Sequence, residues 1–140
     1  MFKIVAFDMD GTIADTIPMC ITAFRNSVSP YTDHELSSEE ILHTFGINEI
    51  GMVKAIVGQN WEAAIEDFYC QYKSLHNEVT SVFPGILKLI AFLKKKNIAV
   101  ALITGKGEKS CTITLKQYLP GSQKSADYPY QAFSYVFKLD

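Results

Sequence analysis

The chain has 140 residues, of which 48% are hydrophobic and 20% are charged, a composition typical of one soluble globular domain that can bury a core. Its net charge of -2 provides no basic surface for nucleic acid and no polybasic patch for a membrane, so we expect neither partner. The cysteines lie far apart and lack CxxC spacing, which argues against a disulfide framework or a zinc site and favours a reducing cytoplasm; they are Cys20, Cys70 and Cys111.

The first predicted element is a short strand near the N-terminus. Residues 4–7, IVAF, form a continuous apolar run, as expected of a parallel strand that is buried on both faces. Asp8 and Asp10 follow at its carboxyl end, where open α/β sheets bind ligands, and Gly11 allows a sharp turn. Two carboxylates in one small site repel each other, and a hard cation such as Mg2+ would relieve that repulsion. We expect no signal peptide, since its removal would take this strand with it.

Four helical segments are predicted between this strand and Pro84. The second segment is predicted to begin at Ser37 and Ser38, which with Glu39 and Glu40 resemble a helix start that has an acidic first turn. Helices without a strand, set between two pieces of α/β pattern, indicate an inserted subdomain. We therefore predict a helical insertion at residues 15–80 and an α/β core at residues 1–14 and 81–140. Apolar residues at helical spacing place the four segments at about residues 17–28, 38–45, 50–57 and 61–79.

A second strand is predicted at residues 98–103, IAVALI, after a helix that begins near Gly85. Two strands joined through a helix form a right-handed crossover, which places Thr104 at the same sheet edge as Asp8. The glycine and lysine that follow Thr104 lack the spacing GxxxxGK[ST], so we reject a P-loop. A helix with Cys111 on its apolar face and a third strand over residues 133–137 complete the predicted elements.

The first strand and the sequence DMDGT at residues 8–12, with ADT at residues 14–16, resemble the first signature of the haloacid dehalogenase superfamily. The branch in question contains phosphoglycolate phosphatase and β-phosphoglucomutase. Thr104, at the end of a hydrophobic strand, resembles the second motif, although Gly105 stands where the branch often has asparagine. The resemblance implies an α/β fold, a partial Rossmann-like parallel sheet core with an inserted α-helical cap that closes over the active site.

The same resemblance implies a Mg2+-dependent phosphomonoester hydrolase that acts on a small phosphorylated metabolite. Asp8 would be the nucleophile that forms an aspartyl-phosphate, and Asp10 would protonate the leaving oxygen and later activate water. Mg2+ would bridge the Asp8 carboxylate and a phosphoryl oxygen, with the backbone carbonyl of Asp10 as a further ligand. Thr104 would orient the phosphoryl group, and backbone amides near Met9 and Gly11 would hold its oxygens. Transfer of the phosphoglucomutase type stays open.

Two further motifs of the superfamily are absent from this sequence: a lysine usually followed by proline, and an acidic pair that completes the metal site. Lys124 and Lys138 stand in no such context. The alternative is therefore a catalytically incompetent fragment or pseudoenzyme, in which the first strand keeps an open edge and allows self-association. For the chain as given, we expect a rate reduced about a thousandfold or more, because a cation and metal ligands are missing.

Overall fold

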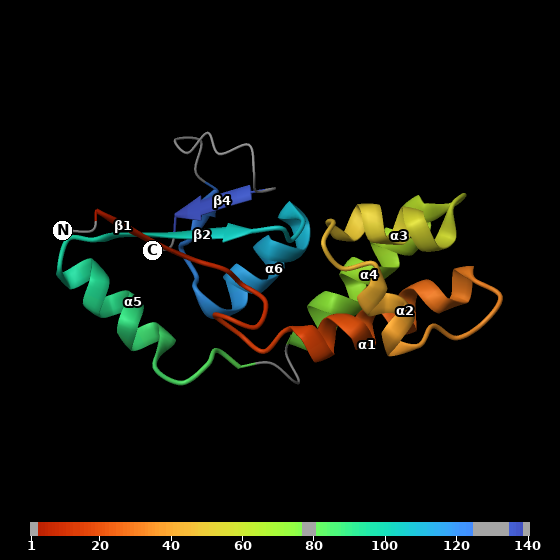
Figure 1. Cartoon of the computed structure of the whole chain (residues 1–140), viewed down its shortest axis with the longest axis horizontal. Helices are drawn as coiled ribbons and strands as arrows, with labels where there is room; N and C mark the ends of the chain where they lie inside the picture. The colour runs from red at the N-terminus through yellow and green to blue at the C-terminus, as the bar shows by residue number, and fades with distance from the viewer. Residues whose placement is uncertain (1–2, 77–80, 125–134, 139–140) are drawn as a thin grey trace. The chain divides into compact units, whose positions relative to one another are not determined.

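The computed structural model describes residues 3–76, 81–124 and 135–138, and the chain divides into two compact units (Figure 1). The sheet unit comprises residues 1–16 and 81–140, and the helical unit comprises residues 17–80. The polypeptide leaves the sheet unit after Thr16 and returns to it at Ser81. These two connections lie side by side, since the Phe83 amide donates to the Ile13 carbonyl at 2.9 Å and Ala14 pairs with Val82 in an antiparallel bridge.

The sheet unit contains the two predicted parallel strands. Strand β1 (Ile4–Phe7) pairs with β2 (Ala99–Thr104), and Phe7 lies opposite Leu102. Both strands therefore end at the same edge of the sheet, which confirms the α/β core with parallel strands. The predicted third strand appears as β4 (Tyr135–Lys138), which runs antiparallel to β2. The two-residue strand β3 (Gln123–Lys124) pairs with β4. Residues 133–134 of the prediction lie outside the described residues.

Strand β1 is more exposed than its apolar sequence indicates. Ile4 is 38% exposed and Ala6 is also exposed, while Val5 and Phe7 are half-buried. The prediction of a strand buried on both faces is wrong, because Val5 and Phe7 pack against the core whereas the alternate residues, Ile4 and Ala6, face solvent. In the described sheet, whose order is β1-β2-β4-β3, β1 also lies at the end. An apolar run does not distinguish an edge strand from a central one. Self-association through this edge stays a prediction.

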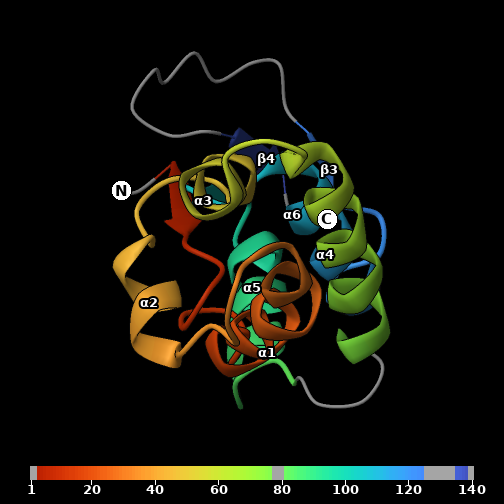
Figure 2. The same cartoon turned by 90° about the vertical axis from the view of Figure 1, so that its right-hand side faces the viewer.

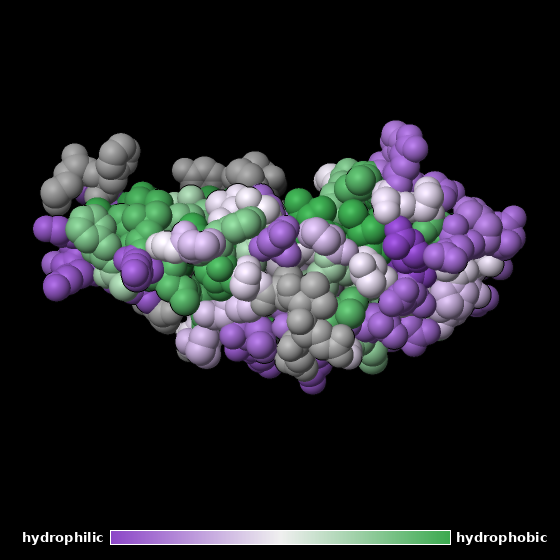
Figure 3. Space-filling view, turned by 90° about the horizontal axis from the view of Figure 1, so that it is seen from below, coloured by the Kyte–Doolittle hydropathy of each residue, from purple (hydrophilic) through white to green (hydrophobic). Residues whose placement is uncertain are grey.

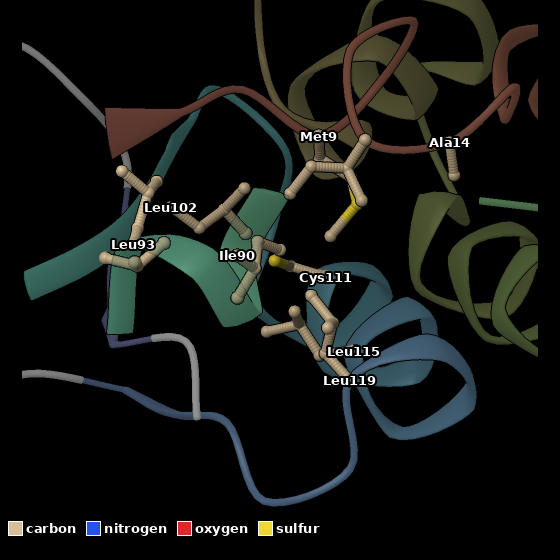
Figure 4. Packing of buried hydrophobic residues seen from close by; sticks show 10 residues of the cluster. Met9, Ala14, Ile90, Leu93, Leu102, Cys111, Leu115 and Leu119 are labelled. Atoms are coloured by element: carbon tan, nitrogen blue, oxygen red, sulfur yellow. The ribbon is translucent and has the colours of Figure 1, made fainter. Parts of the chain in front are cut away.

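Two helices supply the core that supports the sheet. Helix α5 (Ile86–Lys95) contributes Ile90 and Leu93, and helix α6 (Glu108–Tyr118) contributes Cys111 and Leu115. Figure 4 shows these side chains around Leu102 of β2, with the loop residue Met9 beside them. Cys111 is fully buried, which confirms its prediction as a packing residue. The opposite side of α5 is exposed and gives the sheet unit an apolar surface in Figure 3; its residues include Leu87, Leu89 and Phe92.

The helical unit contains the four predicted helices and a short 3-10 helix, η1 (Ser29–Tyr31) (Figure 2). Helix α1 packs against α4 through aromatic rings: the centroids of Phe24 and Phe68 lie 4.6 Å apart, and Phe68 stacks on Tyr72 at 5.4 Å. All three side chains are fully buried. The bounds of the helices are Ile17–Val28 for α1, Ser38–His43 for α2, Glu49–Val57 for α3 and Trp61–His76 for α4.

Local capping signals explain where the short helices begin and end. The Ser37 side chain accepts a hydrogen bond from the Glu40 amide, and the Glu40 carboxylate accepts one from the Ser37 amide at 2.8 Å, so the predicted helix start is a complete capping box. Gly58 ends α3 with a φ of 73°, a conformation that suits glycine. The last residues predicted for α4, 77–79, lie outside the described residues. No helix in the described ranges is long and apolar enough to cross a bilayer.

Candidate active site

A tight loop follows β1 and fixes the two aspartates at the end of the strand. The Met9 carbonyl accepts hydrogen bonds from the amides of Ile13 at 3.0 Å and Ala14 at 3.3 Å, so the chain folds back on itself immediately after the strand. Gly11 has a φ of 77°, a left-handed conformation in which a residue with a Cβ atom would be strained. The sequence DMDG therefore ends the strand and holds its carboxylates at the sheet edge.

Asp8 is the exposed carboxylate of the pair. Its Oδ1 atom accepts a hydrogen bond from the Met9 amide at 2.7 Å, which orients the side chain. An oriented carboxylate that is accessible to solvent can reach a ligand above the sheet edge, as an attacking nucleophile requires.

Asp10 is held much more tightly than Asp8. Its Oδ1 atom accepts a hydrogen bond from the Thr16 hydroxyl, and the Nζ atom of Lys106 lies 3.2 Å from both carboxylate oxygens. The Asp10 side chain is 29% exposed, whereas that of Lys106 is only 2% exposed. The ion pair is therefore shielded from water on the lysine side and open on the aspartate side.

Thr104 lies at the carboxyl end of β2 and is linked to the same pair. Its side chain is buried, and its Oγ1 atom accepts a hydrogen bond from the Lys106 amide at 3.1 Å. A hydroxyl that accepts in this way still has its own hydrogen to donate. The structure thus connects Thr104 to Asp10 through Lys106, at the sheet edge where Asp8 also stands.

The two backbone amides predicted to hold phosphoryl oxygens make other hydrogen bonds in this structure. The Met9 amide donates to the Asp8 carboxylate at 2.7 Å, and the Gly11 amide donates to the Ala14 carbonyl at 2.9 Å. Each amide would have to exchange its partner to bind a ligand, so their role stays a prediction.

Lys106 is the residue of this site that sequence analysis missed. Its contact with Asp10 joins residues 96 positions apart, and local sequence patterns carry no information about such a contact. One signal was available: a lysine two residues after Thr104, at the carboxyl end of a strand, stands at the edge where the two aspartates were placed.

Two aspartates stand at this site, but only part of their oxygen atoms is available to bind a divalent cation. The Asp8 carboxylate and the Asp10 backbone carbonyl are hard donors of the type that Mg2+ prefers. The Asp10 side chain, by contrast, is engaged by a cation that belongs to the chain itself. In the part of the chain that the structure describes, no three acidic, histidine or cysteine side chains lie close enough to hold a metal ion. The residues present fit a hard cation such as Mg2+, which the Asp8 carboxylate and the Asp10 carbonyl would hold.

A second group of titratable residues lies within the helical unit, beside a shallow pocket. His34 contacts Asp33 through Nδ1 and Glu40 through Nε2, both at 2.7 Å. The hydrogen bonds with Asp33 and then with Glu40 raise the pKa of His34. The pKa of Glu40 is lowered to about 2, mainly by the backbone hydrogen bond from Ser37 and then by the bond with His34. These interactions stabilise the start of α2 and involve none of the predicted site residues.

Comparisons with a family model and with curated proteins agree on one family. The family model for haloacid dehalogenase-like hydrolases matches residues 5–119. The chain is 27% identical over 117 residues to phosphoglycolate phosphatase 1 of Pseudomonas aeruginosa, covering 76% of this chain and 43% of that protein. It is 30% identical over 125 residues to phosphoglycolate phosphatase of Pseudomonas fluorescens, and the alignment covers 82% of this chain and 46% of that protein.

A solved structure supports the same fold. CbbY from Rhodobacter sphaeroides, in complex with phosphate, aligns with a TM-score of 0.73 and 19% identity over 84% of this chain and 57% of that one. The chain spans about half the length of the curated relatives it matches, between 43% and 52%. The matched region includes β1 with its aspartates and β2 with Thr104, and this protein belongs to the haloacid dehalogenase-like hydrolase family.

Proposed function

We propose that the chain carries the nucleophile half of a Mg2+-dependent phosphomonoesterase, which hydrolyses a small phosphorylated metabolite through an aspartyl-phosphate. The observation that carries this proposal is the contrast between the two aspartates. Asp8 is exposed and oriented by a single amide, whereas Asp10 is fixed by Lys106 and Thr16. A nucleophile must reach the substrate, and an acid–base group must keep a defined position, so the two environments suit two different roles.

The first step belongs to Asp8. One of its carboxylate oxygens attacks phosphorus in line with the ester oxygen, the new O–P bond forms, and the ester P–O bond breaks. Asp10, in its protonated form, gives its proton to the departing oxygen. Thr104 donates its hydroxyl hydrogen to a phosphoryl oxygen, a role that is compatible with the hydrogen bond its oxygen already accepts.

The second step returns the enzyme to its starting state. The Asp10 carboxylate takes a proton from a water molecule, the water oxygen attacks phosphorus, and the bond between phosphorus and Asp8 breaks. Inorganic phosphate leaves and the Asp8 carboxylate is restored. Mg2+, held by the Asp8 carboxylate and the Asp10 carbonyl, would supply the charge neutralisation that lets an anionic nucleophile approach an anionic ester.

We assign the helical unit, residues 17–80, the role of a cap that selects the substrate. Its insertion between β1 and α5 supports this assignment, as do the phosphoglycolate phosphatases among the relatives. Phosphoglycolate is a small carboxylated phosphomonoester, and it is the first metabolite to test. The same insertion is compatible with phosphoryl transfer to a sugar instead of water.

The rival proposal is a catalytically incompetent fragment or pseudoenzyme of the same family. It is favoured by the sequence, which holds neither a lysine–proline motif nor an acidic pair after Thr104. Hydrolysis of p-nitrophenyl phosphate, measured with and without Mg2+ and beside Asp8→Asn, decides between the two. Turnover that requires Mg2+ and vanishes in Asp8→Asn supports the phosphatase. Folded protein without turnover above Asp8→Asn supports the pseudoenzyme.

A further inference from the structure

Lys106 is a buried cation. No role was assigned to it with either of the two family motifs described above, the one at residues 8–12 and the one at Thr104. Its Nζ atom is 3.2 Å from Oδ1 and 3.2 Å from Oδ2 of Asp10, so it approaches the carboxylate symmetrically. A contact with both oxygens fixes the orientation of the carboxylate as well as its distance. With 2% of the side chain exposed, water does little to screen this interaction.

The position of the ammonium is itself determined by the end of β2. The Lys106 amide donates to Thr104 Oγ1 at 3.1 Å, which closes a turn between the strand and α6. Gly107 then caps α6 in an extended conformation, and Ser110 donates back to its carbonyl at 3.1 Å. The lysine backbone is thus held between two regular elements, and its side chain spans to the loop after β1.

Thr16 completes the arrangement around Asp10. Its hydroxyl donates to Oδ1, and the Thr16 side chain is fully buried. Two donors from different parts of the chain therefore meet on one carboxylate, which leaves 29% of the Asp10 side chain open to solvent. The open part is where a reacting water has to be received.

We propose that Lys106 is a positioning residue for the second chemical step: its contact with both carboxylate oxygens aims Asp10 at the water that attacks the aspartyl-phosphate. This inference rests on the proposed function. In the step itself, Asp10 accepts one proton from water, the water oxygen bonds to phosphorus, and the P–O bond to Asp8 breaks, yielding phosphate and a free Asp8 carboxylate. Lys106 exchanges no atom; its contact with both carboxylate oxygens fixes the direction of the Asp10 side chain.

Because only the second step needs the Asp10 carboxylate as a base, Lys106→Met has a specific kinetic consequence. Release of p-nitrophenolate in the first turnover continues, while hydrolysis of the phosphoryl-enzyme slows by about 100-fold, the loss expected when a base is misplaced. Rapid mixing should show a burst of nitrophenolate and an acid-stable phosphoryl group on the protein. A purely structural role for Lys106 would lower both steps together and give no burst.

Matched variants define the comparison. Lys106→Arg keeps the charge and is expected to recover the second step to within about 10-fold of the wild type. Lys94→Met removes an exposed lysine at the end of α5 and should leave both steps unchanged. If Lys106→Met does not fold, Lys106→Gln, which keeps a hydrogen-bond donor without the charge, carries the same test.

The outcomes separate this inference from the proposed function. A burst in Lys106→Met, absent in Lys94→Met and reduced in Lys106→Arg, supports the positioning role. Wild-type rates of both steps in Lys106→Met, or an equal loss in both, overturn it while leaving the phosphatase intact. No Mg2+-dependent turnover by the wild type contradicts the proposed function itself and removes the step that Lys106 is inferred to serve.

Discussion

The Asp10–Lys106 pair gives the sharpest stability prediction, because its two partners differ in exposure. Lys106 is 2% exposed and Asp10 is 29% exposed. At 3.2 Å and an effective dielectric constant near 20, their attraction is about 5 kcal/mol, and the cost of removing both charges from water offsets much of it. Removing one partner should therefore cost more when the buried ammonium is the group that remains.

The expected values follow from that asymmetry. Asp10→Asn removes the carboxylate that contacts the buried ammonium, and should lower the free energy of unfolding by about 3 kcal/mol. Lys106→Met leaves a carboxylate that water reaches and that Thr16 still binds, and should cost about 1 to 2 kcal/mol. The double variant removes both charges and should cost little more than Lys106→Met alone, so the coupling free energy is about 2 to 3 kcal/mol.

Urea denaturation followed by circular dichroism measures all four proteins, with Lys94→Met as the control for loss of an exposed lysine. Equal costs for Asp10→Asn and Lys106→Met, or costs that add in the double variant, would contradict this asymmetry. Additive costs would mean that the two side chains are not paired in solution.

Three further predictions concern the helical unit and the β2 turn. The pKa of His34 is raised, so its contribution to the stability of α2 is complete below about pH 6.5 and is lost as the pH rises through the raised value. The pKa of Glu40 is lowered to about 2, so its contribution is complete above pH 4.5 and is lost as the pH falls toward 2. Amide protection factors in α2, which correct the exchange rates for their intrinsic pH dependence, should be highest between these limits, and His34→Gln should remove the loss on the alkaline side. Phe68→Ala should destabilise the helical unit by about 3 to 5 kcal/mol, read from the fluorescence of Trp61, the single tryptophan, and an unchanged urea midpoint would contradict the aromatic core described above. Gly105→Asn should fold with an unchanged melting temperature, because an added Cβ meets no atom within 4 Å, and a drop of several degrees would show that the turn requires glycine.

Elements with local signals were predicted well from the sequence. Helix α2 begins at the serines and glutamates of residues 37–40, as predicted, because a capping box depends on residues only three positions apart. Helix α1 ends at Val28, immediately before Ser29 and Pro30, for a similarly local reason. The parallel pairing of β1 with β2 also followed from the sequence, since a single helix connects them.

Features that depend on distant residues were not predicted. The exposure of one face of β1 depends on what packs against that face, and its own apolar residues are the same in either case. The antiparallel direction of β4 depends on the path of the preceding chain. Lys106 was considered only as part of a P-loop pattern, which was rejected. Its side chain contacts Asp10, which lies 96 positions earlier in the chain. The sequence therefore placed the aspartates and Thr104 at one sheet edge but not the cation that links Asp10 to Thr104, and the catalytic roles of these residues stay predictions.

The most direct test of the account is to look for the aspartyl-phosphate itself. Wild-type protein and Asp8→Asn would be mixed with p-nitrophenyl phosphate and Mg2+, quenched in acid within the first turnover, and analysed by intact mass and peptide mapping. We expect one phosphoryl group on the wild type, located in the peptide that contains Asp8, and none on Asp8→Asn. Turnover without a phosphoryl-enzyme, or the same label on Asp8→Asn, would contradict the assignment of Asp8 as the nucleophile.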